Sequence, residues 1–414
     1  MDTLTALDVG TSKVVCAVAE FSRDGDLDIV ARGVYHCNGL TNGNVTNMDA
    51  AKEAVEHAIE DVEKAGYGVN KVIVGITGES VVSSYSKGVV AIGGDEQGIT
   101  KADIDRVIQS TNQVGFPSGS ELVAVIQRGF SVDNQRGIVH PEALIGHRLE
   151  AEAYACAASS SYLCTLRNLL ENCGMSAYDR GFIPSSIASS WAVLTEDEKE
   201  LGVMMVDMGL GTLDLAIYSN REVAYTSVLG RGGSYLALDV AQSFNIPISE
   251  AERVILEEGS ASAEFITDGS SDKDVVAQSV SNDIQVSFTR RELANVLEAQ
   301  LDEQLDWMKE QMEQASKNLR INVSGVVFTG GASLLLGLAQ KARKTLGVPV
   351  RVAAPCYPSR LPQNLASPIY STVVGLLLYG VANLPVQERE KTTKRSRGFR
   401  GLIDTMVEWL NKVF

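Results

Sequence analysis

Two short stretches of the sequence decide the fold: Asp207-Met208-Gly209-Leu210-Gly211-Thr212 and, about 200 residues earlier, Asp8-Val9-Gly10-Thr11. Each lies between two apolar runs rich in β-forming residues, which predicts the turn of a β-hairpin. Glycine in such a turn lets backbone N–H groups approach an anion, because no Cβ is in the way, and successive N–H groups form an anion-binding nest. A single turn of this kind is ordinary. Two of them with matching strands predict a phosphate-binding pair.

The surroundings of the two turns repeat in the same order. In the first half we expect a helix over 49–65 with Asp49 as its N-cap, and strands over 4–9, 13–21, 27–35 and 71–76. In the second half we expect strands over 201–206, 213–218 and 222–228, then a helix over 235–244. Further on, helices are expected over 289–318 and 334–346, and strands over 326–329 and 350–352. This order indicates an internal duplication of a mixed α/β layer.

Residues 83–156 interrupt the first half. They combine Gly/Ser-rich turns with one short helix expected over 100–110 and strands over 122–132 and 147–155, which indicates an inserted side domain. The first layer then resumes with helices expected over 161–172 and 186–194 around a strand over 177–183. An acidic connector, 195–200, leads into the second half.

These patterns divide the chain into six parts. A first subdomain is predicted over 1–82, continued by 157–195 and 365–384, and the inserted domain over 83–156. A second subdomain is predicted over 196–229, continued by 305–364, and a smaller subdomain over 230–304 with an exposed loop over 261–273. A linker over 385–397 and a terminal amphipathic helix over 398–414 follow.

The two hairpins define a candidate phosphate and metal site. Asp8 and Asp207 should face one another across a cleft and hold Mg²⁺, directly or through water, because this hard cation takes oxygen ligands and keeps several waters. Thr11, Ser12 and Thr212 add hydroxyl donors, and Lys13 follows the first turn.

Two further glycine clusters complete the candidate site. Gly232 and Gly233 precede a helix, where free N–H groups favour a terminal phosphate. Gly330, Gly331 and Ala332 end a strand, and their small size leaves room for a flat base against the backbone. A Rossmann dinucleotide site fits less well, since the G-x-G-x-x-G fingerprint is missing and the duplication would be unexplained.

Composition excludes several other classes. The 414 residues carry 36 Lys and Arg against 52 Asp and Glu, a net charge of −16, so the broad positive field of a nucleic-acid-binding protein is missing. The six cysteines contain no C-x-x-C pair and there are four histidines, which disfavours both zinc and a disulfide framework. With no signal peptide and no run of about 20 apolar residues, we expect a cytoplasmic protein.

The last 24 residues differ from the rest. Residues 391–414 carry six basic and two acidic side chains, a local charge of +4. Apolar residues recur there at helical spacing: Phe399, Leu402, Ile403, Met406, Trp409, Leu410, Val413 and Phe414. Sixteen helical residues span roughly 24 Å, too short to cross a bilayer but adequate to lie in its interface with anionic lipid. The alternative is a helix docked on the protein's own core or on a partner subunit.

Three motifs carry a resemblance to a known group of proteins. Asp8-Val9-Gly10-Thr11, Asp207-Met208-Gly209-Leu210-Gly211-Thr212 and Thr329-Gly330-Gly331-Ala332 resemble the phosphate and adenosine motifs of the actin, Hsp70 and sugar-kinase superfamily. Within it the chain is similar, from end to end, to the FtsA family of bacterial cell-division proteins. The more specific marks are the stretches at 194–203 and 370–377 and the amphipathic tail.

The resemblance implies a duplicated actin-like ATPase fold that binds ATP and Mg²⁺, with Glu252 as a weaker candidate for the ribose hydroxyls. It also implies a protein that polymerises and ties the division filament protein FtsZ to the cytoplasmic face of the membrane at the septum. The implied partners are the acidic C-terminal peptide of FtsZ, other copies of the chain, anionic lipid and other division proteins. We expect Arg290 and Arg291 near the peptide.

Two departures bear on the chemistry. Leu210 stands where the superfamily usually has glycine, which would be strained if its φ were positive and would otherwise point away. Ile183 precedes Pro184 where hydrolytic relatives place a glutamate, and only serine hydroxyls follow, so no confident catalytic residue is identified and at most slow ATPase activity is expected. The main alternative is a small-molecule kinase of the same fold. A chaperone of the Hsp70 type would need a peptide-binding domain for which there is no room.

Overall fold

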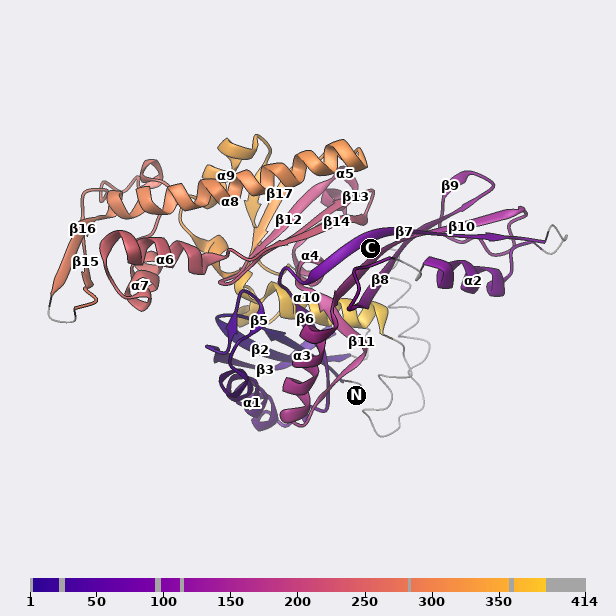
Figure 1. Ribbon diagram of the computed structural model, residues 1–414, viewed down its shortest axis with the longest axis horizontal. Coiled ribbons are helices and arrows are strands. Elements are labelled where there is room, and N and C mark those ends of the chain that lie inside the picture. The colour runs from indigo at the N-terminus through magenta and orange to yellow at the C-terminus, as the bar shows by residue number, and fades with distance from the viewer. Residues whose placement is uncertain are drawn as a thin grey trace.

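The computed structural model in Figure 1 describes residues 3–21, 27–93, 98–111, 115–281, 284–356 and 361–384 of the 414-residue chain. Two five-stranded sheets form the centre of the molecule, one below the other in this view. A smaller helical subdomain and an inserted sheet domain lie at opposite ends of the long axis (Figure 1). The tail residues predicted to bind membrane, Phe399 to Phe414, and the linker 385–397 lie outside the described residues.

The first sheet has the order β11-β6-β1-β2-β3. Its strands are β1 (Thr3–Val9), β2 (Lys13–Phe21), β3 (Leu27–His36), β6 (Lys71–Ile76) and β11 (Ser176–Pro184). Strand β1 pairs antiparallel with β2 and parallel with β6. Its helices are α1 (Met48–Lys64), α3 (Ser160–Asn172), α4 (Ser185–Val193) and α10 (Ser371–Asn383), with the short strands β4 (Leu40–Thr41) and β5 (Asn44–Val45) beside them.

The second sheet repeats this plan in the order β14-β13-β12-β17-β18. Its strands are β12 (Val203–Met208), β13 (Leu213–Ser219), β14 (Glu222–Leu229), β17 (Gly325–Thr329) and β18 (Val350–Val352). Strand β12 pairs antiparallel with β13 and parallel with β17, as β1 does with β2 and β6. The predicted duplication of a mixed α/β layer is therefore confirmed. One hydrophobic core fills the first half and reaches one face of the second sheet, and another fills the remainder of the second half.

The inserted domain is an antiparallel sheet with the order β7-β10-β8-β9. Its elements are β7 (Val81–Ala91), α2 (Lys101–Thr111), β8 (Ser120–Val132), β9 (Gln135–Ile138) and β10 (Arg148–Ser159). Helix α2 packs on one face and encloses a third, smaller core around Val107 and Leu149. Turns were predicted where β7 lies, because Ser and Gly hide the alternation of this strand, and β9 was not predicted.

The smaller subdomain extends from the second half. It holds α6 (Gly233–Phe244), α7 (Ile248–Glu258), η1 (Ala263–Phe265), β15 (Asp274–Gln278), β16 (Gln285–Thr289) and the start of α8 (Arg290–Leu319). Helix α8 then runs along the second sheet, and η2 (Gly331–Leu334) and α9 (Leu338–Leu346) follow β17. The short turns η3 (Gln363–Leu365) and η4 (Pro368–Tyr370) lead into α10.

Two local predictions were wrong. Helix α1 is capped by Asn47, whose side chain accepts a hydrogen bond from Ala50 N at 3.2 Å, and Asp49 lies in its first turn. The predicted acidic connector over 195–200 is largely the helix α5 (Glu196–Leu201), because Thr195 and Glu198 form a reciprocal capping box that satisfies its N-terminal donors.

Candidate functional site

The two predicted hairpin turns face one another across a cavity of about 70 Å³ between the halves. It is lined by Asp8, Val9, Gly10, Thr11, Ser12, Lys13, Thr77, Ser185, Asp207, Gly209, Leu210, Gly211, Thr212, Asp214, Gly330, Gly331, Pro368, Ile369 and Thr372. Eleven residues predicted from the sequence to bind nucleotide are among them. The structure therefore brings together most of the predicted site, while its binding role stays a prediction.

The turns have matching backbone geometry. Gly10 N donates to Lys13 O at 3.0 Å, and Gly209 N donates to Thr212 O at 2.9 Å. The two turns also approach each other closely, since a Cβ at Gly211 would overlap Thr11 Oγ1 and would lie 3.1 Å from the Asn42 backbone. Glycine is required at 211 by this close approach of the opposite half.

Leu210 causes no backbone strain. It is not among the described non-glycine residues with positive φ, so the strain considered in the sequence analysis does not arise. Leu210 O accepts a hydrogen bond from Ser234 N at 2.7 Å, and a Cβ on Gly233 would lie 3.8 Å from Leu210 Cδ1. The leucine therefore forms part of the contact between this turn and the loop that precedes α6.

Three carboxylates surround the cavity: Asp207 and Asp214 are buried, and Asp8 is half-buried. Burial raises the pKa of Asp8 to about 7, with a smaller rise from the neighbouring Asp207 and an opposing effect of Lys13. Burial also raises the pKa of Asp207, against hydrogen bonds that Ser189 Oγ donates at 2.5 Å and Thr372 Oγ1 at 2.9 Å. Asp214 has its pKa raised to about 7, again mainly by burial. Carboxylates held this way favour a cation that would offset their desolvation.

Sequence reasoning missed Asp214 and Thr77. Thr77, directly after β6 in the first half, donates from Oγ1 to Asp214 Oδ1 at 2.5 Å, and its Oγ1 lies 3.0 Å from Thr212 Oγ1 in the second half. These bonds join the halves across the cavity. An aspartate inside the otherwise apolar strand β13 is a signal that could have identified Asp214, whereas nothing in the sequence marks Thr77.

The chemistry of the cavity fits a magnesium–phosphate group. Asp8 and Asp207 supply hard oxygen ligands, and the glycine turns leave backbone N–H groups close to the space between them. Within the described ranges, no set of three His, Cys, Asp or Glu side chains is arranged to hold a metal ion by itself. Asp8 and Asp207 would therefore hold Mg²⁺ together with phosphate oxygens and water.

The other two predicted glycine clusters occupy different positions relative to the cavity. Gly330 and Gly331 line the cavity, and a Cβ at Gly330 would overlap Asp207 Oδ1. Gly232 and Gly233 lie behind the second turn, where their N–H groups donate to Gly211 O at 3.2 Å and Gly209 O at 2.9 Å. These two amides brace the turn and so do not point at the cavity. Ala332 does not line the cavity and lies against Gly233.

The residues predicted to contact ribose and the FtsZ peptide lie outside this cavity. Glu252 lies on α7 and does not line the cavity, so its contact with ribose stays a prediction. Arg290 is nine-tenths buried and is held internally, donating to Glu258 O at 2.9 Å and to Asp268 Oδ2 at 3.0 Å. Its guanidinium is therefore engaged within the subdomain, and its place near the peptide stays a prediction. Arg291 is half-exposed and pairs with Asp272.

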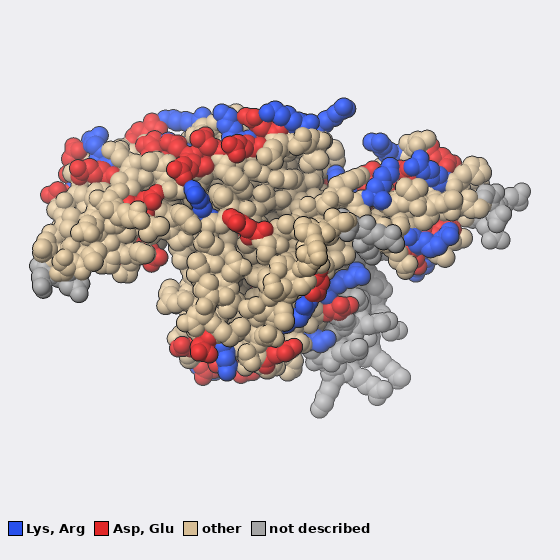
Figure 2. Space-filling model, viewed as in Figure 1, with Lys and Arg blue, Asp and Glu red and all other residues tan. Residues whose placement is uncertain are grey.

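The surface charge agrees with the composition. On the face shown in Figure 2, uncharged side chains cover most of the area, Asp and Glu gather over its upper part and Lys and Arg lie in small groups, so this face carries no continuous basic surface. None of the helices that the structure describes is both long and apolar enough to span a membrane.

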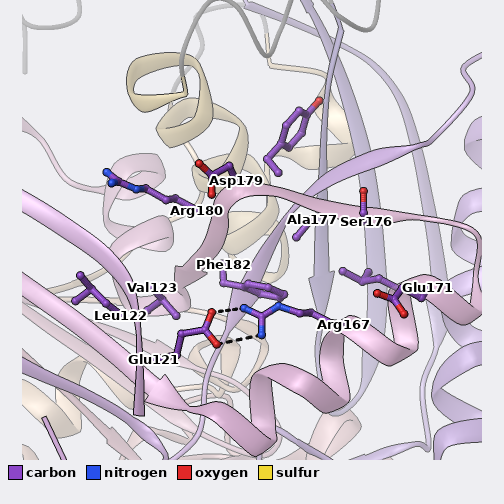
Figure 3. Close-up of a pocket in the computed structure, with 12 residues that line it drawn as sticks. Glu121, Leu122, Val123, Arg167, Glu171, Ser176, Ala177, Asp179, Arg180 and Phe182 are labelled. Atoms are coloured by element: carbon purple, nitrogen blue, oxygen red, sulfur yellow. Dashed lines mark hydrogen bonds and ion pairs between the residues drawn. The ribbon is translucent and has the colours of Figure 1, made fainter. Parts of the chain in front are cut away.

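A second, larger cavity of about 350 Å³ lies where the inserted domain meets the first half (Figure 3). Glu121 of β8 and Arg167 of α3 form an ion pair at its floor, and the Arg167 guanidinium lies 5.4 Å from the ring centre of Phe182. Packing between the inserted domain and the first half is therefore incomplete.

Several solved structures share this architecture. The PilM-PilN type IV pilus biogenesis complex matches with a TM-score of 0.65 at 16% identity, covering 91% of this chain and 98% of that one. MreB5 of Spiroplasma citri bound to ADP matches with a TM-score of 0.54 at 14% identity, covering 95% of this chain and 97% of that one, and MreB 5 bound to AMPPNP matches equally well. These matches establish the actin-like fold.

Sequence comparisons identify the family. The model of the cell division protein FtsA matches residues 204–375, and that of the SHS2 domain inserted in FtsA matches 78–156. Cell division protein FtsA of Neisseria meningitidis is 31% identical over 99% of this chain and 98% of its own length. The Pseudomonas aeruginosa protein is 33% identical over 91% and 89%. The chain therefore belongs to the FtsA family of cell-division proteins.

Proposed function

We propose that the chain binds ATP with Mg²⁺ in the cleft between its halves. The observation that carries this proposal is the pair of glycine hairpins with Asp8 and Asp207 on opposite walls of one cavity. The ADP- and AMPPNP-bound structures of the MreB relatives, which share the fold, support it. When bound, the magnesium nucleotide would neutralise the buried carboxylates, and the turn amides would orient its phosphates.

The proposed activity extends to polymerisation and membrane tethering. In this proposal the polymer connects FtsZ to the cytoplasmic face of the membrane at the septum and recruits other division proteins. Membership of the FtsA family supports these roles. The small subdomain would receive the acidic FtsZ peptide, and Arg291, half-exposed at the start of α8, is now its better candidate contact.

Hydrolysis is proposed to be slow. The segment over which relatives position the attacking water holds Ile183 and serines, and Ser189 Oγ already donates to Asp207. Among the described residues that line the cavity there is no glutamate and no glutamine. A hydroxyl that is engaged with the metal ligand is a poor substitute for a general base.

Calorimetric titration of the full chain with ATP and Mg²⁺ tests the nucleotide proposal. We expect Asp207→Ala and Gly330→Asp to abolish binding, and the matched control Asp306→Ala, exposed on α8, to bind like the parent. Unchanged affinity in both cleft variants would overturn the cleft assignment. A phosphotransfer assay against a panel of small acceptors separates this function from the kinase alternative, which requires acceptor-dependent ATP turnover.

A further inference from the structure

We propose that the inserted domain is latched to the second half, so that nucleotide entry into the cleft shifts the inserted domain. The latch is a set of polar contacts between Ser83, Arg128 and Tyr154 of the inserted domain and Glu222 and Thr226 of β14. The inference rests on the proposed nucleotide site and adds a conformational output to it.

The centre of the latch is a closed hydrogen-bonded triangle. Tyr154, which is buried, accepts a hydrogen bond from Thr226 N at 2.6 Å, and its hydroxyl lies 3.1 Å from Thr226 Oγ1. Thr226 Oγ1 donates to Ser83 Oγ at 2.9 Å, and Ser83 Oγ is also hydrogen-bonded to the Tyr154 hydroxyl. Three side chains and one backbone amide therefore satisfy one another across the junction of two sheets.

An ion pair extends the latch along the same strand. Arg128 Nε donates to Glu222 Oε2 at 2.8 Å, and both side chains are largely buried. Strand β7 runs beside β14 in the centre of the molecule without pairing with it (Figure 1). Side chains therefore make this junction, and they can separate without breaking a β-ladder.

The inserted domain is also held to the first half, by the chain itself and by the packing of β8 against β11. The 350 Å³ cavity of Figure 3 lies between β8, α3 and β11, and the Glu121–Arg167 ion pair at its floor joins β8 to α3. The entry strand leaves the cleft wall at Thr77 and passes Gly78, which has φ +105, before β7 begins at Val81. Between them, Ser80 Oγ is buried with no hydrogen-bond partner in the described part of the chain. Thr77 N donates to the Tyr162 hydroxyl at 3.4 Å and Gly230 N donates to Glu79 Oε1 at 3.3 Å, so this connection contacts both halves.

Nucleotide entry requires the halves to move. The cavity between the turns measures about 70 Å³, whereas small-molecule sites have roughly 300–1,000 Å³. Widening it must separate Thr77 from Asp214, whose bond closes the cavity. Because the chain and the Glu121–Arg167 ion pair hold the inserted domain to the first half, that domain leaves the second half when the cleft widens, and the latch opens. The narrow cleft and the intact latch therefore belong to one conformation.

Coupling between the latch and the nucleotide site is reciprocal, so the proposal can be tested by measuring ATP affinity. If the latch stabilises the narrow cleft, then weakening the latch must raise ATP affinity. We expect Tyr154→Phe and Glu222→Gln each to bind ATP at least about threefold more tightly, as loss of one hydrogen bond implies. The matched control is Tyr225→Phe. It removes a tyrosine hydroxyl from β14, the strand of Glu222 and Thr226, but this hydroxyl donates to Gln311 Oε1 within the second half, at 2.7 Å. It should bind ATP like the parent.

Hydrogen exchange on the unmodified protein provides a second measurement. Saturating ATP and Mg²⁺ should speed amide exchange in residues 81–91 and 222–229. The latch would be overturned if its variants bound ATP like the parent. It would also be overturned if ATP left amide exchange in these two segments unchanged. Neither result would contradict the nucleotide site. Failure of the parent to bind ATP would instead overturn the proposed function and this inference together.

Discussion

Gly330 and Asp207 are in direct contact: a Cβ at position 330 would overlap the Asp207 carboxylate oxygen Oδ1, and Gly330 also holds φ +83. The end of β17 is thus fitted against the acid at the end of β12. Any side chain at 330 displaces a group that we propose as a magnesium ligand.

Gly330→Ala is therefore expected to abolish ATP binding in calorimetry and to lower stability by about 1–3 kcal/mol, because φ +83 with ψ 168 lies in a region that is essentially restricted to glycine. Gly347→Ala is the control, because Gly347 also has a positive φ, +72 with ψ 14, but open space around a Cβ. It should lose about 1–2 kcal/mol, the cost of an L-residue in the left-handed region, and keep ATP affinity. Equal ATP affinity in the two variants would show that the contact with Asp207 does not matter for binding.

Burial of Asp8 makes stability depend on pH. Its pKa rises from 3.8 to about 7, so between these values the folded protein holds a proton that the unfolded chain has released. Stability without nucleotide must then fall as pH rises from about 4 to 7. We expect Asp8→Asn to raise the melting temperature relative to the parent more at pH 8 than at pH 5. An equal difference at both pH values would contradict the raised pKa.

Arg290 is expected to contribute to folding more than to partner binding. Arg290→Ala removes hydrogen bonds to Glu258 and Asp268 from a largely buried guanidinium and should cost about 1–3 kcal/mol in denaturant unfolding. Arg291→Ala should stay within about 0.5 kcal/mol, because its ion pair is exposed. FtsZ-peptide affinity should fall in Arg291→Glu, and an unchanged affinity would remove Arg291 from the proposed contact.

ATP turnover is expected to stay below about 1 s⁻¹, against a median of roughly 10 s⁻¹ for enzymes. The reason is the missing carboxylate or amide in residues 183–190. Phosphate release by the purified full chain, with Asp207→Ala as the blank for contaminating ATPases, measures it. Faster turnover that the blank lacks would require a general base elsewhere in the cleft.

The tail is expected to bind anionic vesicles reversibly. Trp409→Glu with Phe414→Glu should reduce the vesicle-bound fraction at least about tenfold, since each large apolar side chain contributes roughly 1.5–3 kcal/mol when buried. Thr405→Glu with Asn411→Glu adds the same charge on the polar face and is expected to weaken co-sedimentation much less. If both pairs behaved alike, charge alone would explain the loss and the apolar face would have no role.

Sequence predicted the features that depend on neighbouring residues. The hairpin turns at Gly10 and Gly209 were predictable because each lies between its own two strands. Thr77 and Asp214 were not, because their bond joins residues 137 positions apart and exists only after the halves assemble. The same holds for Arg290: two adjacent arginines look alike in sequence, and burial against the loop at Asp268 distinguishes them.

Local competition explains the remaining errors. Asn47 and Asp49 are both good N-caps, and the choice between them was settled by the backbone at Asn47, which is extended at φ −138. The capping box of α5 was overlooked because its acidic residues suggested a solvated linker, although Thr195 and Glu198 have the spacing of that motif.

The inserted domain leaves and re-enters the first half through neighbouring strands, with Val81 of β7 paired to Ala158 of β10. The two ends of the insertion are therefore only about 5 Å apart, one strand spacing. This geometry suggests an order of events during folding. Once β7 and β10 have paired, the 76 residues between Val81 and Ala158 no longer form an open loop for the first half. Pairing β7 with β10 first is therefore favoured over closing this loop last by about 2–3 kcal/mol of loop-closure entropy. The sheet of the first half can then assemble almost as if its chain were continuous.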